Sequence, residues 1–275
     1  MEFSSDVISL EVTDHVATLW LDRPDARNAL GGAFWRDLPR ACEAVASEED
    51  IRVLILAATG PHFSVGLDLK EFGGSLVRGE SASSKAASNA KTYVSIKALQ
   101  ASVSALAELS IPVIAAVHGY CIGGAIDLIC ACDIRLASSD AIFSVRETKI
   151  AIVADLGTLQ RLPRIVGAGH VAELAYTGKD IDAHHAERIG LVNTTHEGSA
   201  SEVLAAAQAL AREIAANSPL AVKGTKAVLA ANEGRSVDEG LDFVARWNTM
   251  YLASNDLSEA MSAFVERRAP TFRGD

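Results

Sequence analysis

Residues 111–166 decide the fold of this chain: IPVIAAVHGYCIGGAIDLICACDIRLASSDAIFSVRETKIAIVADLGTLQRLPRIV. The apolar run from Val113 to Val117 has the length of a buried strand. The pair Gly123-Gly124 follows, and Ala125 to Cys132 is typical of an apolar helix. A glycine pair between a buried strand and a helix leaves backbone N–H groups free at the positive end of the helix. Such groups suit a developing negative charge on a small oxygen.

Three acidic residues follow in the same apolar neighbourhood. Asp127 lies in the first helical turn, Glu147 follows the next strand, and Asp155 comes eight residues later, next to an apolar run. An unpaired carboxylate is costly to bury, so such an acid usually has a partner or a chemical role. Burial and neighbouring like charges raise at least one pKa, which lets one group act as acid and another as base near neutral pH. The pattern therefore indicates proton transfer next to a carbonyl group.

Each acid also has a structural explanation. Asp127 could simply favour the dipole of its helix. Glu147 could form a salt bridge with Arg146 or Lys149. Asp155 has the weakest structural explanation of the three, because its neighbours are apolar.

Five segments resemble the enoyl-CoA hydratase/isomerase (crotonase) superfamily in order and spacing. They are LDRPDARNAL at 21–30, HFSVGLDLKEF at 62–72, the Gly123-Gly124 segment, DIRLASSDAIFSVRETKIAI at 133–152, and LAYTGKDIDAHHAERIGLVN at 174–193. The resemblance implies an α/β fold, a crotonase-like spiral of ββα units. It also implies a spiral core domain with an acyl-CoA site at residues 1–195 and a helical C-terminal oligomerisation region at 196–275, which would form a homotrimer or homohexamer.

Within the superfamily, Asp127, Glu147 and Asp155 together resemble the acidic triad of Δ3,5-Δ2,4-dienoyl-CoA isomerases, enzymes of fatty acid β-oxidation. The resemblance implies that Asp155 removes a proton from C2 of a 3,5-dienoyl-CoA and that Glu147 returns one at C6. Asp127 would tune or orient this pair. The sequence leaves open which acid is the base and which is the donor.

The resemblance also implies an oxyanion hole formed by the backbone N–H groups of Leu67 and Gly124. The residues expected to bind CoA and substrate are Arg27, Ala29, Ser64, Gly66, Leu67, Asp68, Tyr120, Gly123 and Gly124. Phe264 and Arg267 are weaker candidates for the adenine and phosphate end, across a subunit boundary. Without the family, the segment around Gly66 is an ordinary turn before a helix that Asp68 caps.

Composition and net charge restrict the classes of molecule that the protein can be expected to bind. A net charge of -10 and a pI near 5.2 argue against a nucleic-acid or membrane-surface binder. The four cysteines lack the CxxC spacing of metal or redox sites. Adjacent His184 and His185 would point about 100° apart on a helix, so we expect no metal there. We expect no cofactor besides the acyl-CoA substrate.

Location is predicted from the chain ends and the cysteines. The first residues, MEFSSDVISLEV, lack the pattern of a signal or transit peptide, and the chain ends in Arg-Gly-Asp instead of a peroxisomal Ser-Lys-Leu. These features predict a cytoplasmic protein with reduced cysteines.

Three other functions compete with the dienoyl isomerase. A 2-enoyl-CoA hydratase would usually carry Glu, not Asp, at position 127. A Δ3-Δ2-enoyl-CoA isomerase can work with a single carboxylate. The alternative from a different class is a non-catalytic acyl-CoA-binding subunit on a crotonase scaffold. A serine hydrolase or a P-loop protein has no motif here.

The periodicity predicts the remaining elements. Expected are a hairpin at 7–12 and 16–22, strands at 51–58 and 191–195, and helices at 32–47, 92–109 and 168–177. Residues 73–90 form the segment that is least typical of regular structure, either a lid or a loose loop. Four more helices are expected at 202–217, 220–232, 237–253 and 257–268.

Overall fold

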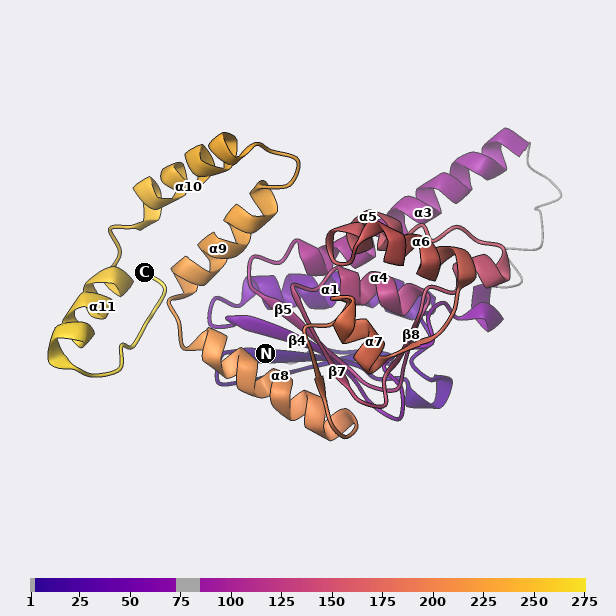
Figure 1. Cartoon of the computed structure of the whole chain (residues 1–275), viewed down its shortest axis with the longest axis horizontal. Helices are drawn as coiled ribbons and strands as arrows, with labels where there is room; N and C mark the ends of the chain where they lie inside the picture. The colour runs from indigo at the N-terminus through magenta and orange to yellow at the C-terminus, as the bar shows by residue number, and fades with distance from the viewer. Residues whose placement is uncertain (1–2, 73–84) are drawn as a thin grey trace.

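A seven-stranded sheet forms the centre of the molecule in the computed structural model, which describes residues 3–72 and 85–275 (Figure 1). In spatial order the strands are β1 (Phe3–Ser4), β2 (Ile8–Thr13), β3 (Val16–Leu21), β4 (Val53–Ala58), β5 (Val113–Val117), β7 (Ile134–Ser138) and β10 (Thr194–His196). The first three strands are antiparallel and the others join in parallel. The predicted hairpin is confirmed, and it turns at Asp14 and His15, both with positive φ.

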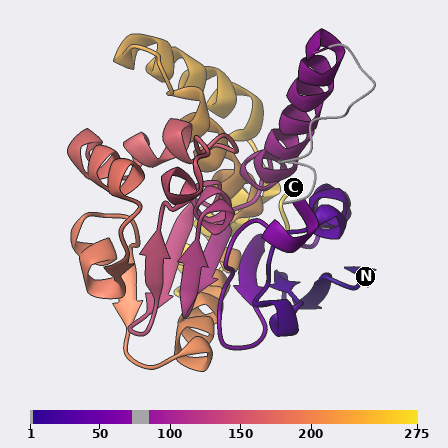
Figure 2. The same ribbon diagram turned by 90° about the vertical axis from the view of Figure 1, so that its right-hand side faces the viewer.

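Each face of the sheet packs against different helices, because successive strand residues point to opposite sides. On β4, Leu54 and Leu56 join the core beneath α1 (Gly32–Ser47), whereas Val53 and Ile55 pack against α8 (Ala200–Ala215). Figures 1 and 2 show α8 on one side of the strands and α1, α3 (Lys85–Ala107) and α4 (Gly124–Cys130) on the other.

A second, three-stranded sheet carries the glycine pair. It consists of β6 (Tyr120–Ile122), β8 (Ile142–Ser144) and β9 (Ile181–Asp182), in the order β6-β8-β9. The chain turns from β5 into β6 at Gly119, where φ is +54°. A side chain at that position would collide with the carbonyl oxygen of Pro61, 2.3 Å away. The turn brings residues 120–124 to the end of the large sheet.

Most of the predicted helices are confirmed, and two other predicted segments need correction. Residues 85–90 belong to α3, although they were expected to be irregular; residues 73–84 of that lid or loop lie outside the described residues. The last strand begins at Thr194 rather than at 191, because Leu191 and Val192 are buried in the core through a turn after Gly190 (φ +83°). The shorter helices are η1 (Pro24–Ala26), η2 (Glu147–Ile150), α5 (Thr158–Arg161), η3 (Leu162–Arg164), α6 (Ala168–Thr177) and α7 (Ala183–Arg188).

The C-terminal helices divide into one that packs on the sheet and three that extend away. Val203, Ala207, Ala211 and Ala215 form a stripe on α8 at a spacing of four residues and are buried against the sheet. Helices α9 (Pro219–Ala231), α10 (Val237–Tyr251) and α11 (Asn255–Glu266) reach outward from it (Figure 1). The domain boundary near residue 195 stays a prediction. None of the described helices is long and apolar enough to cross a membrane.

Candidate active site

The glycine pair supplies the first free backbone donor. Gly123 has φ of +58° and donates its N–H to the carbonyl oxygen of Ser144 at 2.9 Å. Helix α4 begins at Gly124, where the helix itself offers no acceptor to the N–H group. Within residues 3–72 and 85–275 no other acceptor binds the Gly124 N–H. The donor is therefore available to a ligand.

The turn at residues 63–68 supplies the second donor. The Gly66 N–H is bonded to the Ser64 hydroxyl at 3.1 Å, and the Asp68 N–H to the carbonyl oxygen of Leu30 at 3.1 Å. The Leu67 N–H between them has no acceptor in the described part of the chain. The groups that bond to Leu30 are the Gly66 carbonyl and the Asp68 N–H, on either side of Leu67. The Leu67 N–H between them therefore points away from Leu30.

Gly66 lets the two donors approach each other. Its φ is +80°, and a β-carbon there would lie 2.5 Å from the carbonyl oxygen of Ile122 and 3.0 Å from the Gly124 nitrogen. Only glycine fits this conformation and this close approach without strain. The arrangement has the geometry of an oxyanion hole, in which two backbone N–H groups bind one oxygen.

Asp127 is the most deeply buried of the three acids, with 1 % of its surface exposed. Its Oδ1 accepts a hydrogen bond from the Thr158 N–H at 2.6 Å. Burial raises the pKa of Asp127 to about 7; the bonds from Thr158 oppose this rise, and the charges of Glu147 and Asp155 add to it. The three carboxyl groups therefore lie close enough to influence one another.

Glu147 opens helix η2 and is directed toward the glycine pair. A β-carbon on Gly123 would lie 3.5 Å from its Oε1, and its Oε2 is buried without a hydrogen-bond partner in the described chain. Burial, followed by the charge of Asp155, raises the pKa of Glu147. Among the described residues Glu147 forms neither of the salt bridges considered from the sequence: Arg146 pairs with Asp180 at 2.5 Å, and Lys149 forms no ion pair with Glu147.

Asp155 lies in the irregular segment between η2 and α5. It is half-buried, and burial raises its pKa. The protonated form of all three acids is thus favoured relative to an exposed carboxyl group. A group of carboxyls with raised pKa values can give and take protons near neutral pH.

The segments expected to bind CoA meet beside this site. The Val65 N–H donates to the carbonyl oxygen of Arg27 at 3.2 Å, and the Ser64 N–H to that of Tyr120 at 2.8 Å. Arg27 is exposed, and the Tyr120 ring stacks on His62 with centroids 4.4 Å apart. Ala29 lies within the same loop, one residue before Leu30.

Some of the expected residues have structural roles or lie elsewhere. The Ser64 hydroxyl donates to the carbonyl oxygen of Asn28 at 2.7 Å, and Asp68 accepts from the N–H groups of the following helical turn and pairs with Arg23 at 2.9 Å. Phe264 and Arg267 lie at the end of α11, away from α4 within one chain (Figure 1).

Sequence reasoning missed Arg23 and Thr158. Arg23 lies 45 residues from the aspartate it pairs with, and Thr158 offers only its backbone to Asp127. No spacing or residue type in the sequence signals either contact.

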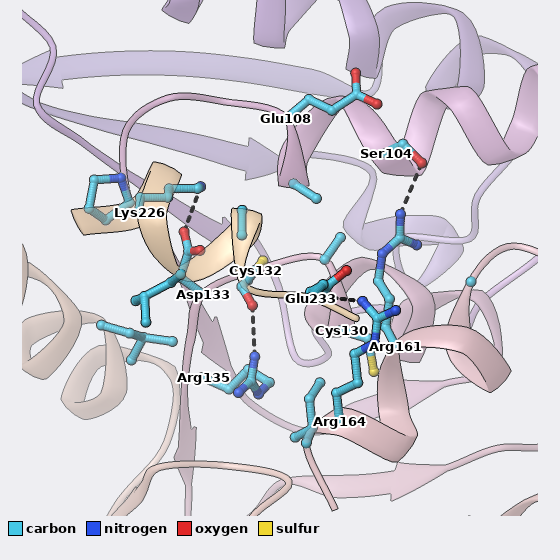
Figure 3. A pocket seen from close by; sticks show the side chains of 18 of the residues that line it. Ser104, Glu108, Cys130, Cys132, Asp133, Arg135, Arg161, Arg164, Lys226 and Glu233 are labelled. Atoms are coloured by element: carbon cyan, nitrogen blue, oxygen red, sulfur yellow. Dashed lines mark hydrogen bonds and ion pairs between the residues drawn. The ribbon is translucent and has the colours of Figure 1, made fainter. Parts of the chain in front are cut away.

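A cavity of about 1660 Å³ lies between α3, α5, α8 and α9 (Figure 3). Asp155 lines one edge of it, but Asp127 and Glu147 do not. Two ion pairs lie in its wall, Lys226 with Asp133 at 2.7 Å and Arg164 with Glu233. Of the three acids, the cavity therefore reaches only Asp155.

Metal ligands do not cluster in the part of the chain that the structure describes: no group of three or more His, Cys, Asp or Glu could hold an ion. All four cysteines are buried and unpaired. His184 and His185 lie on α7, as expected.

Comparison with known proteins gives a consistent result. The family model described as enoyl-CoA hydratase/isomerase matches residues 11–275. The Δ3,5-Δ2,4-dienoyl-CoA isomerase named peroxisomal from Arabidopsis thaliana is 43% identical, over 97% of this chain and 96% of its own. The one named mitochondrial from Dictyostelium discoideum is 43% identical, over 94% of this chain and 87% of its own. The crystal structure of an enoyl-CoA hydratase from Bacillus anthracis superposes with a TM-score of 0.88 at 31% identity, over 98% of this chain and 100% of that one.

Proposed function

The chain belongs to the enoyl-CoA hydratase/isomerase family, and we propose that it isomerises 3,5-dienoyl-CoA to 2,4-dienoyl-CoA. One observation carries the proposal. Three mutually influencing carboxyl groups have raised pKa values, and one of them, Glu147, lies beside the glycine pair, whose Gly124 N–H and the Leu67 N–H have no acceptor in the described chain. The relatives named dienoyl-CoA isomerases support the same reaction.

The backbone donors would bind the thioester carbonyl oxygen. Removal of a proton from C2 places negative charge on that oxygen and along the conjugated chain. The N–H groups of Leu67 and Gly124 stabilise this charge, and because they are fixed by the turn and by α4, no reorganisation is needed during the reaction. Side-chain identity at position 67 is unimportant for this role.

Two separate carboxyl groups are needed because the proton leaves C2 and returns at C6. We assign removal to Asp155 and return to Glu147. Glu147 has a buried oxygen that lacks a hydrogen-bond partner among the described residues, and both burial and a neighbouring charge favour its protonated form, which suits a donor. Burial also raises the pKa of Asp155, so this group too can exchange a proton near neutral pH. Asp127 is held by the Thr158 N–H and would orient the pair.

CoA would lie along the joined loops at residues 27–30 and 63–68. Three backbone hydrogen bonds join these loops, and together with the exposed position of Arg27 they support this placement. A guanidinium group there would bind phosphate oxygens. No cofactor beyond the thioester is required for a proton shuttle.

The assembly we propose is a homotrimer, alone or paired as a homohexamer, formed through α9–α11. The exposed apolar side chains of these helices support it: Leu229, Val237, Leu241, Met250, Met261 and Phe264. Apolar surface of this kind marks association sites. A partner subunit could then bring its own Phe264 and Arg267 to the CoA loops.

The location we propose is the cytoplasm. The four unpaired, buried cysteines support a reducing compartment. Fractionation of cells that express the protein at its natural level would test this proposal.

The decisive experiment offers purified protein two substrates in parallel. Formation of the conjugated 2,4-dienoyl product from 3,5-dienoyl-CoA is followed by ultraviolet absorbance, and hydration of 2-enoyl-CoA is followed by loss of its absorbance. We expect rapid isomerisation and slow hydration. Rapid hydration without isomerisation would instead identify a hydratase, and binding without either reaction would identify a non-catalytic subunit.

A further inference from the structure

The segment that carries Asp155 obtains its support from side chains of other elements. Between η2 and α5 it forms no strand or helix. The carbonyl oxygen of Asp155 accepts a hydrogen bond from Gln100 Nε2 at 2.7 Å, and that of Leu156 accepts one from Arg161 Nη1 at 3.4 Å. In the part of the chain that the structure describes, these are the only hydrogen bonds to the two carbonyl groups.

Both supports lead to α3. Gln100 and Ser104 lie four residues apart, on the same face of that helix. The Nη2 group of Arg161 donates a hydrogen bond to the Ser104 hydroxyl at 2.9 Å, as Figure 3 shows. The nearby Val103 and Leu106 are fully buried, so this part of α3 is anchored in the core. The helix is therefore a rigid support for the segment.

The Gln100 amide is itself oriented. Its Oε1 accepts a hydrogen bond from Lys97 Nζ at 2.8 Å, which leaves the NH2 group to face Asp155.

Gly157 places a second constraint on the segment. Its φ is +132°, and a β-carbon there would lie 1.9 Å from an Arg161 guanidinium nitrogen. Only glycine allows the guanidinium group to pack this closely against the turn.

We propose that Gln100 and Arg161 are positioning residues that hold the Asp155 segment against α3 and so place the Asp155 carboxyl group relative to Glu147. On its other side the segment continues into Thr158, whose N–H binds Asp127. Asp155 is thus held between α3 and α4. The kinetic consequence of this inference rests on the proposed function. A misplacement of a reacting group by about 1 Å can cost on the order of 10²-fold in rate.

The first test measures the segment itself and is independent of any activity. Gln100→Leu removes the donor, and Gln100→Glu keeps the shape but places an acceptor opposite the carbonyl group. Amide hydrogen–deuterium exchange at Thr158, whose N–H at the end of the segment is bonded to Asp127, should rise at least about tenfold in both variants, while exchange in β4 and β5 stays unchanged. Gln160→Leu is the matched control, because this exposed glutamine lies just beyond the same segment and its side chain forms no hydrogen bond with any residue that the structure describes. Unchanged exchange in both Gln100 variants would overturn the proposal.

The second test measures the consequence for the reaction. Gln100→Leu should lower kcat for 3,5-dienoyl-CoA about tenfold with little change in KM, because a displaced base affects the chemical step. In an Asp155→Asn background the same substitution should cost nothing further. An equal loss in that background would show a general structural effect and would overturn the positioning role. If wild-type protein does not turn over the diene, the proposed function fails, and the exchange measurement alone decides the support of the segment.

Discussion

Asp127 illustrates how a single residue combines a structural and a chemical role. Its carboxyl group is buried at the start of α4, yet its Oδ1 accepts a hydrogen bond from the backbone N–H of Thr158 in α5. Burial is the main reason that its pKa reaches about 7, compared with 3.8 for a free aspartate. The folded protein therefore holds a proton that the unfolded chain releases at lower pH.

We predict from this shift that Asp127→Asn stabilises the protein at pH 8. Between about pH 4 and pH 7 the folded state binds more protons than the unfolded state, so the stability contributed by Asp127 falls as pH rises and is constant above pH 7. Asparagine does not titrate and keeps an acceptor for the Thr158 N–H. The gain should be on the order of 1–4 kcal/mol at pH 8 and should vanish near pH 4. Urea unfolding of both proteins across this range measures it; an equal difference at all pH values would contradict the shift.

The two acids that exchange protons should show non-additive kinetics. Asp155→Asn and Glu147→Gln should each lower kcat for dienoyl isomerisation by about 10²–10⁴-fold, the usual contribution of a general acid or base. Because both act in one relay, the double variant should be little slower than the slower single variant. Binding of a saturated acyl-CoA, measured by calorimetry, should survive in all three. Near-wild-type isomerisation by Asp155→Asn would refute its assignment as the base.

Two backbone elements, the turn at 63–68 and the start of α4, form the oxyanion hole together. Each is held by its own hydrogen bonds, and a glycine stands on either side of their contact. The two glycines differ, however, in what they tolerate. Gly66 requires positive φ and has backbone atoms within 3.0 Å of any added β-carbon, whereas Gly124 is helical and faces the tip of the Leu30 side chain at 3.2 Å.

This difference predicts contrasting variants. Gly66→Ala should lower the free energy of unfolding by about 2–4 kcal/mol, because it combines backbone strain with a backbone collision. Gly124→Ala should cost under about 1 kcal/mol, since alanine suits a helix and a flexible side chain can yield. Its methyl group would nevertheless lie 3.8 Å from the Leu67 nitrogen and crowd a bound oxygen, so kcat should still fall at least about tenfold. Thermal melts combined with kinetics separate the two effects; loss of folding in Gly124→Ala would contradict this reading.

At the scale of the whole molecule, the chain separates into a packed body and an outlying helical region. Helix α8 completes the core, whereas α10 and α11 expose apolar side chains, with Phe264 82 % exposed and Val265 79 % exposed. A monomer would leave this apolar surface in water. Sedimentation at micromolar concentration should therefore show an oligomer, of three or six copies if the proposed assembly is right, and Met261→Lys with Phe264→Lys should shift the protein toward monomers. Wild-type protein that sediments as a compact monomer would refute the assembly.

Local pattern was sufficient to predict much of this protein. Periodicity located the hairpin, α1, α6 and the C-terminal helices, because strand and helix burial repeat every two and every three to four residues. The glycine pair and the three acids were also recognisable, since acidic residues and a glycine pair stand out in a sequence of otherwise apolar residues. These are properties of a residue and its immediate neighbours in the chain.

Contacts between distant segments could not be predicted in this way. Gln100 reaches the Asp155 carbonyl across 55 residues, and Thr158 binds Asp127 across 31. Neither contact depends on a distinctive residue type: one uses an ordinary glutamine and both use a backbone group. Such bonds arise only after the sheet and helices have packed, because packing determines which polar groups face each other in a buried space. The residue types that carry the proposed chemistry can therefore be recognised from local sequence, while the alignment of the reacting groups is a property of the folded molecule.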